Sequence, residues 1–348
     1  MNNTIRENNI KKEQGLSEYA TQAINSKGRI TPIEPCLIRT CFVRDRDRII
    51  HSKSFRRLKH KTQVFLSPEG DHYRTRLTHT LEVTQIARTL ARALALNEDL
   101  TEAISLGHDL GHTPFGHAGE RTLNCLSVGY IGEVPRNLFP NGFLHNKQSL
   151  RVVDILENNG KGLNLTSEVR DGILNHKLST NPITLEGKIV SYADRIAYIN
   201  HDIEDAIRAD IITISDLPKQ TIEILGVTKS NRINTLILDI IENSMGKNQI
   251  VMSDKIKIEF DRLYNYMQDN IYNNESPAKG EEIKADRLLR LLYKWFMKSP
   301  EKLPELYIKL LDEYDKSTVV CDYIASMTDR YATKLFEDIY IPLRWDKM

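Results

Sequence analysis

The sequence is poor in the residues that interrupt helices and in those that form cross-links. It has only 17 glycines and 12 prolines in 348 residues, which favours long helices over a β fold with many turns. Its four cysteines include no C-x-x-C pair, which excludes a zinc knuckle or thioredoxin-like motif and fits a reducing cytoplasm. No apolar run reaches about 18 residues, and residues 1–15 hold no apolar signal core. Membrane spanning and secretion by a standard signal are therefore not expected.

An excess of charge of either sign is also missing. The chain has 48 Lys and Arg against 47 Asp and Glu, a net charge of +1. No bulk field draws the protein to nucleic acid or to an anionic membrane, so a nucleic-acid partner is not indicated. One local basic run covers residues 44–61, and a solvated helix face is the ordinary interpretation of such a run.

Hydrophobic residues recur at helical spacing along most of the chain, which predicts an all-α fold. We expect helices at 77–94, 100–106, 146–158, 166–176, 186–209, 231–245, 255–272, 280–297, 305–314 and 317–337, and a loop at 129–146. Residues 248–252 are the one candidate strand, and no alternating series supports a sheet. We expect a polar lead-in at 1–28, a core at 29–210 and a helical extension at 211–348 that packs on the core.

A histidine-rich segment lies between the first two predicted core helices and the loop at 129–146. It contains the adjacent pair His108-Asp109, whose imidazole nitrogen and carboxylate oxygen are ligand atoms for a divalent cation. Such a pair arises often by chance and is weak evidence alone. His79 strengthens it, because it lies three residues after Arg76 on the same face of the preceding helix.

Polar residues also follow one stripe of the predicted helix 186–209. Asp194, Tyr198 and Asp202 occur at steps of four, which places them on one side of the helix. A carboxylate on a stripe that faces the core needs a partner, because burying it alone costs several kcal/mol. From the residues alone, a metal ion and an internal arginine are equally good partners.

The order His, His-Asp, Asp resembles that of the HD-domain metal-dependent phosphohydrolase superfamily. The surrounding blocks resemble one branch of it, the deoxyguanosine triphosphate triphosphohydrolase-like proteins, relatives of the vertebrate dNTP triphosphohydrolase. The similar blocks are RDRDRIIHSKSFRRLKHKTQVF, RTRLTHTLEV, GHDLGHTPFGHAGE, ADRIAYINHDIEDA and DYIASMTDRYA. The resemblance implies an HD-domain catalytic core at 29–210 and a metal-dependent hydrolase that cleaves a deoxynucleoside triphosphate, such as dGTP, into deoxynucleoside and triphosphate.

The resemblance also implies roles for particular residues. The expected ligands of a divalent ion (Mn²⁺, Mg²⁺, Fe²⁺ or Co²⁺) are His79, His108, Asp109 and Asp194. The expected catalytic pair is His117 and Glu120, with the choice between acid and base left open for His117. The expected substrate-binding residues are Gln63, Arg76, His112, Arg195, Tyr198 and Asp202.

Further expectations concern partners and rival functions. The resemblance implies a cytoplasmic homo-oligomer, a tetramer or hexamer, with a dNTP effector for which the basic run 44–61 is a candidate surface. The alternative functions are another HD-domain phosphohydrolase (a nucleotidase or an alarmone or cyclic-nucleotide hydrolase) and a non-catalytic nucleotide-binding relative. Asp329 and Arg330 in the last block either help to close the substrate pocket or form structural ion pairs.

Overall fold

The computed structural model describes residues 2–63, 74–132, 134–135, 138–272 and 277–342. In these ranges the regular structure is helical, and the only β contacts are two isolated bridges, Arg29–Thr166 and Thr62–Thr75. The predicted all-α fold is confirmed. None of the described helices combines the length and apolarity needed to cross a bilayer.

Three helices form the centre of the molecule: α4 (Arg76–Ala93), α5 (Glu98–Gly107) and α10 (Leu185–Arg208). Each begins at a polar residue whose side chain accepts a backbone N–H of the first turn, and these residues are Thr75, Asn97 and Thr184. Helix α4 packs against both α5 and α10, and their facing aliphatic side chains are buried. Burial of each such side chain contributes about 1.5–3 kcal/mol to the free energy of folding. The packing of these helices therefore fixes the positions of the residues that project between them.

Shorter elements surround this centre. Those before and around it are α1 (Asn2–Lys12), η1 (Glu13–Gly15), η2 (Ala23–Asn25), α2 (Cys41–Ile50), α3 (Lys53–Arg57), η3 (Leu58–His60), α6 (Gly116–Ser127), α7 (His145–Arg151), η4 (Val152–Leu156), α8 (Glu157–Gly160) and α9 (Ser167–Leu174). The helix predicted at 146–158 is therefore interrupted. It passes into the π-helical turn η4, and Asn158 and Asn159 then adopt left-handed backbone angles that end regular helix.

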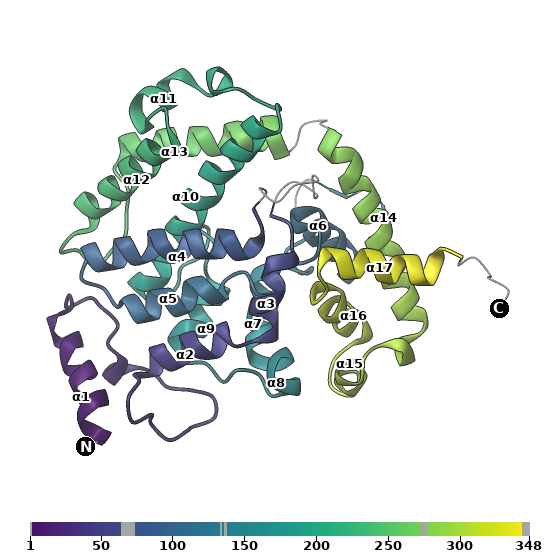
Figure 1. Cartoon of the computed structure of the whole chain (residues 1–348), viewed down its shortest axis with the longest axis horizontal. Helices are drawn as coiled ribbons and strands as arrows, with labels where there is room; N and C mark the ends of the chain where they lie inside the picture. Colours follow the sequence, from purple (N-terminus) through teal and green to yellow (C-terminus); the bar gives the residue numbers. More distant parts are fainter. Residues whose placement is uncertain (1, 64–73, 133, 136–137, 273–276, 343–348) are drawn as a thin grey trace, which may run out of the picture.

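The chain after the core forms two groups of helices (Figure 1). The first group consists of η5 (Ile214–Asp216), α11 (Lys219–Leu225), α12 (Lys229–Ser244), α13 (Asp254–Met267) and η6 (Gln268–Tyr272). It packs on α10 through α12 and α13. The second group consists of α14 (Pro277–Lys298), η7 (Pro300–Lys302), α15 (Glu305–Leu310), α16 (Lys316–Ala325) and α17 (Asp329–Tyr340). It packs on α6 through α14 and α16, so the expected C-terminal helical extension is present.

Two local predictions in this extension are wrong. Residues 248–252 form no strand. The apolar side chains of Ile250 and Met252 are instead buried in the helical core. The single helix predicted at 317–337 is two helices, because the chain turns between Ala325 and Asp329 and Thr328 caps the second one by accepting the N–H of Tyr331.

The basic run 44–61 is only partly a solvated face. Lys53, Arg56 and Lys59 are exposed, as that interpretation predicts. Lys61 is buried instead, and its ammonium group donates to the backbone oxygens of His112 and Ala325. A buried ammonium group requires such acceptors, so the end of this run is an internal tie between distant segments.

Candidate active site

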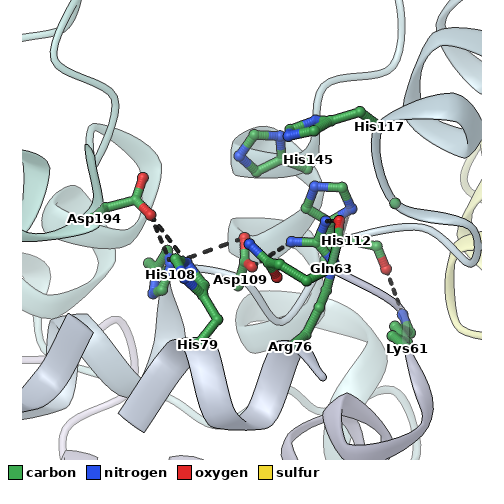
Figure 2. Close-up of polar contacts among 12 residues, drawn as sticks. Lys61, Gln63, Arg76, His79, His108, Asp109, His112, His117, His145 and Asp194 are labelled. Carbon is green, nitrogen blue, oxygen red and sulfur yellow. Dashed lines mark hydrogen bonds and ion pairs between the residues drawn. The ribbon is translucent and has the colours of Figure 1, made fainter. Parts of the chain in front are cut away.

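Four of the predicted ligand residues converge where α4, α5 and α10 meet (Figure 2). His79 projects from α4, His108 and Asp109 follow the end of α5, and Asp194 lies on α10. Oδ1 of Asp194 lies 3.1 Å from Nε2 of His79 and 3.7 Å from Nε2 of His108. One ligand atom from each of His79, His108 and Asp109 also lies within 4.8 Å of the others. Asp194 thus contacts both imidazoles of a triad whose ligand atoms could hold one ion.

The ionisation of the two carboxylates suits a cation. Burial alone would raise the pKa of Asp109, yet the adjacent Arg76 and His108 lower that pKa well below its usual value. Asp194 behaves alike, because its contacts with His79 and His108 outweigh burial and lower its pKa. Burial alone would lower the pKa of His79, but its hydrogen bond to Asp194 raises it. Both carboxylates are therefore ionised near neutral pH, which is the form that binds a metal.

The arrangement around His108 fits a metal ligand. Its Nδ1 lies 2.6 Å from the backbone oxygen of Ser105, so Nδ1 carries the proton and Nε2 has a free lone pair. That Nε2 is buried and has no hydrogen-bond partner within the described part of the chain. A buried nitrogen acceptor without a partner costs free energy, and a cation at this point would satisfy it. A backbone oxygen that fixes the tautomer of a ligating histidine is a common outer-shell device.

Helix α7 holds the segment that carries these ligands. Oγ of Ser149 donates to the backbone oxygen of His108 at 2.7 Å and accepts the N–H of Gly111 at 2.9 Å. A Cβ on Gly111 would lie 2.1 Å from the backbone nitrogen of Ser149. Only glycine permits this close approach, so the spacing between His108 and His112 depends on it.

A second polar cluster adjoins the first and contains the predicted catalytic pair. His117 lies at the start of α6, with a side chain 51% exposed, and its Nδ1 is 3.6 Å from Oε2 of the buried Glu120. Burial alone would raise the pKa of Glu120, but His145 and His117 lower it well below its usual value. The ionised carboxylate faces both imidazoles. The structure therefore brings His117 and Glu120 close to each other.

An unusual backbone places His117 at this point. Phe115 and Gly116 both have positive φ angles, of 61° and 56°. Left-handed geometry is costly for phenylalanine, and Gly116 also lies where a Cβ would meet the backbone oxygen of Gln63 at 2.8 Å. The turn therefore needs external support, which the C-terminal extension supplies.

That support comes from Asp329, the first residue of α17. Its Oδ1 accepts the N–H of Phe115 at 2.9 Å, and its Oδ2 accepts the N–H of Thr62 at 2.9 Å as well as the Thr62 hydroxyl. Asp329 thus binds two loops of the core rather than an arginine. None of the described hydrogen bonds of Asp329 joins it to a basic residue, so they give no support to an ion-pair role. They instead link α17 to the chain just before Gln63 and just before His117.

Two histidines that the sequence did not single out complete the second cluster. Nδ1 of His145 lies 2.8 Å from Oε1 of Glu120, and its ring stacks on His112 with centroids 4.7 Å apart. Nε2 of His145 lies 3.1 Å from Nε2 of His176. Burial, with His108 and His145 nearby, lowers the pKa of His176 to about 3, so that ring is neutral. No motif spacing links these residues, and only their histidine identity could have signalled them.

The predicted phosphate-binding residues fall into two groups. Nη1 of Arg76 lies 2.5 Å from Oδ2 of Asp109, beside the ligand cluster. Burial and Arg76 hold the pKa of His112 well below its usual value, and both ring nitrogens of His112 are buried without a partner among the described residues. Arg195 points elsewhere, with its guanidinium 3.9 Å from the centroid of the Tyr264 ring and 3.5 Å from Asp261.

Two of the predicted sugar-binding residues, Tyr198 and Asp202, lie between α10 and the first C-terminal group. Oδ2 of Asp202 accepts the hydroxyl of Tyr272, which sequence reasoning missed, and Oδ1 of Asp202 is buried without a partner in the described ranges. Burial raises the pKa of Asp202 to about 7. The rings of Tyr198 and Tyr264 lie 6.5 Å apart, edge to face. Gln63 is buried, and its side-chain oxygen also has no partner among the residues described.

A helical core with a His, His-Asp and Asp set at the junction of three helices defines the class of HD-domain proteins. In agreement, residues 76–199 match the HD domain model and residues 250–338 match the phosphohydrolase-associated domain. Among curated proteins, the chain is 54% identical to a deoxyguanosinetriphosphate triphosphohydrolase-like protein of Caldanaerobacter subterraneus, covering 95% of this chain and 94% of the relative. Proteins of the same name from Clostridium tetani (47%; 92% of each chain) and Clostridium perfringens (49%; 94% of each chain) are also similar.

The chain therefore belongs to the deoxyguanosinetriphosphate triphosphohydrolase-like family. The resemblance inferred from the motif blocks is confirmed. Membership in this family, together with the His and Asp clusters, supports a metal-dependent phosphohydrolase.

Proposed function

We propose that this protein hydrolyses deoxynucleoside triphosphates to deoxynucleoside and inorganic triphosphate. The observation that carries the proposal is the continuity of three polar groups, each with its ligand atoms within 4.8 Å of one another. His79, His108 and Asp109 form the first group, and Asp109 then joins His112 and His145. His112 in turn joins His117 and Glu120. In this proposal an ion site, a phosphate contact and a proton-transfer pair would lie side by side.

In this proposal His79, His108, Asp109 and Asp194 hold one divalent ion, which could be Mn²⁺, Mg²⁺, Fe²⁺ or Co²⁺. When bound, the ion would polarise a phosphate oxygen and lower the pKa of a coordinated water molecule. The four donors leave coordination positions for water and phosphate, because these ions accept up to about six ligands. The free lone pair of His108 supports this assignment.

His117 would transfer the proton at the bond between the α-phosphorus and the sugar oxygen. Its half-exposed ring lies at the edge of the site, where it can reach a substrate, and Glu120 faces its Nδ1. A carboxylate at that nitrogen orients the ring and leaves Nε2 for the reaction. Both directions of transfer, to the leaving oxygen or from the attacking water, suit this geometry.

Arg76 and His112 would bind the phosphates. A triphosphate carries about four negative charges, and guanidinium groups bind such oxygens by charge-assisted hydrogen bonds. Neutral His112 has two unpaired nitrogens, so it can donate one N–H to a phosphate oxygen. Arg195 would contribute only after leaving its position over Tyr264.

Tyr198, Asp202 and Gln63 would read the sugar. Tyr198 and Asp202 follow Asp194 by one and two turns of α10, so a sugar next to the metal-bound phosphate would face them. A 2′-hydroxyl would press on the Tyr198 ring, whereas the unpaired Oδ1 of Asp202 and Oε1 of Gln63 could accept hydrogen bonds from a 3′-hydroxyl. The site should therefore prefer dNTP to NTP.

The decisive experiment identifies the phosphorus product. Purified protein with Mn²⁺ is incubated with each dNTP, singly and mixed, and products are separated by ion-exchange chromatography. Intact triphosphate is expected. A nucleoside monophosphate, pyrophosphate or phosphate would refute the proposal in favour of another HD-domain phosphohydrolase, and a protein that binds dNTP without any product would be a non-catalytic relative.

A sugar-site variant tests the specificity. Tyr198→Ala removes the ring that would exclude a 2′-hydroxyl, so the preference for dGTP over GTP, measured as the ratio of kcat/KM, should fall by about tenfold. The control is Tyr130→Ala, which removes an exposed tyrosine outside α10 and should leave the ratio unchanged. Equal hydrolysis of GTP and dGTP by the unaltered protein in every nucleotide mixture would contradict this role.

Assembly and location form a separate part of the proposal. We propose a cytoplasmic homo-oligomer, a tetramer or hexamer, with a dNTP as effector and the exposed part of the basic run 44–61 as a candidate surface. Sedimentation velocity with and without dNTP tests this, and a monomer under both conditions would refute it.

A further inference from the structure

A chain of hydrogen bonds extends inward from the proposed proton-transfer pair. Oε1 of Glu120 lies 2.8 Å from Nδ1 of His145, and Nε2 of His145 lies 3.1 Å from Nε2 of His176. All three residues are buried. The other oxygen of Glu120 faces His117, so the chain ends at the residue that would contact the substrate.

The contacts of His176 fix which nitrogen carries its proton. Its Nδ1 lies 2.7 Å from the backbone oxygen of Ile173, and a carbonyl oxygen only accepts hydrogen bonds. The proton is therefore assigned to Nδ1, which leaves Nε2 of His176 as an acceptor. The proton between the two rings then belongs to Nε2 of His145.

Glu120 holds the other side of the His145 ring. The Nδ1 of His145 faces Oε1 of Glu120, which also accepts the backbone N–H of His145 at 2.9 Å. The His145 ring is therefore held between the Glu120 carboxylate and the acceptor nitrogen of His176.

The backbone around these rings is held in place. His176 lies just after α9, and His145 is the first residue of α7. Nδ2 of Asn146 donates to the backbone oxygen of Leu174 at 2.8 Å, which ties the two helix ends together. The acceptor nitrogen of His176 is therefore presented to His145 by fixed secondary structure.

We propose that His176 is a positioning residue for the hydrolysis proposed above, acting through His145 and Glu120 on His117. The inference rests on that proposed function. With the acceptor of His176 in place, the His145 ring has one orientation, and the Glu120 carboxylate is held with Oε2 toward His117. Without it, the His145 ring can rotate and the carboxylate loses a fixed partner. A misplacement of about 1 Å at the reacting group can cost on the order of 100-fold in rate.

The test compares His176→Leu with His176→Gln. Leucine removes the acceptor, whereas the glutamine side-chain oxygen can take the place of Nε2 and accept from His145. We expect His176→Leu to lower kcat by about 10–100-fold with KM within about twofold, and His176→Gln to recover most of the rate. Lys309→Leu, which replaces an exposed side chain of α15, should match the unaltered protein.

Two measurements separate positioning from a general structural role. Bound Mn²⁺ should be equal in all variants, because His176 is not one of the proposed metal ligands. Its ring only packs against that of the ligand His108. In the double variant His145→Ala/His176→Leu, the second change should add nothing to the loss from His145→Ala, since the effect passes through His145.

A spectroscopic readout follows the His176 ring itself. In ¹⁵N-histidine-labelled protein, NMR should show a ring protonated on Nδ1 that is absent from both His176 variants. Wild-type kcat in His176→Leu, equal loss in both His176 variants, loss of Mn²⁺, additive losses in the double variant, or absence of this ring form would overturn the inference. Release of a nucleoside monophosphate by the unaltered protein would overturn only the proposed function, because kcat for that product tests His176 in the same way.

Discussion

Asp329 joins the C-terminal extension to both loops that border the candidate site, and its removal should affect rate more than stability. Its carboxylate accepts hydrogen bonds from the N–H of Phe115, the N–H of Thr62 and the Thr62 hydroxyl. Asp329→Ala leaves these donors without the acceptor. The left-handed turn at Phe115 then loses its external support, and His117 two residues later moves with it.

The size of both effects follows from these contacts. A hydrogen bond to a charged group contributes about 1.5–3 kcal/mol when buried, and these groups are half-buried, so we expect a total loss of about 2–4 kcal/mol. The entropy of unfolding of about 2.1 cal/mol/K per residue makes 1 kcal/mol worth about 1.4 °C in a chain of 348 residues. Tm should therefore fall by about 3–6 °C, while displacement of His117 lowers kcat by about 10–100-fold.

The assay measures kcat for triphosphate release well below Tm, so that every variant is folded. Asp329→Asn keeps one acceptor oxygen and should lie between the unaltered protein and Asp329→Ala. The matched control is Asp315→Ala, which removes the exposed carboxylate that caps α16 through Thr318 and should cost about 1 kcal/mol with kcat unchanged. If Asp329→Ala lowers Tm but keeps the original kcat, the extension only stabilises the fold and the argument for positioning His117 is refuted.

Four further predictions concern the site itself. Asp109→Ala should abolish Mn²⁺ binding and turnover. In the unaltered protein, Mn²⁺ affinity should weaken by up to about tenfold for each pH unit below the raised pKa of His79, because the metal must displace that proton. Isothermal titration at pH 5.5 and 7.5 tests both predictions, and equal affinities of the unaltered protein at the two pH values would contradict the ligand role of His79. His117→Ala should retain Mn²⁺ and lose at least about 100-fold in kcat; a smaller loss in single-turnover kinetics would exclude it as acid or base. The pKa of Asp202 is raised from 3.8 to about 7, so its protonated form stabilises the fold fully below about pH 4 and this contribution is lost as the pH rises through 7. Between pH 5 and 8 the free energy of unfolding of the unaltered protein should therefore fall by about 2–3 kcal/mol relative to that of Asp202→Asn. Urea unfolding at the two pH values measures this difference, and an equal change in both proteins would disprove the buried, uncharged state.

The parts of the site that lie within single helices could be predicted from the sequence. Helical periodicity identified α4 and α10, and steps of three or four residues placed Arg76 with His79 and Asp194 with Tyr198 on common faces. His108 and Asp109 follow directly after the end of α5. Their two donors are close together because the residues are adjacent in the chain. In each case the distance along the helix fixes the distance in space.

The contacts between helices were decided by the tertiary structure. His145 meets Glu120 and His176 across sequence separations of 25 and 31 residues, and Tyr272 meets Asp202 across 70. No local pattern encodes such a pairing, because each partner's helix is positioned by apolar packing elsewhere. Arg195 illustrates the converse: its place in the motif pointed to the phosphates, whereas packing against α13 puts it over Tyr264.

The turn before α17 shows the same division at the level of the backbone. The composition of residues 317–337 favours one continuous helix, and local propensity is what the sequence expresses directly. The chain instead turns at 326–328 and Thr328 caps α17, and the Asp329 carboxylate there binds Thr62 and Phe115, more than 200 residues away in sequence. Local sequence thus determined which helices form and which donors they carry, and long-range packing and hydrogen bonding determined how these donors meet, because those free energies arise only once distant segments are in contact.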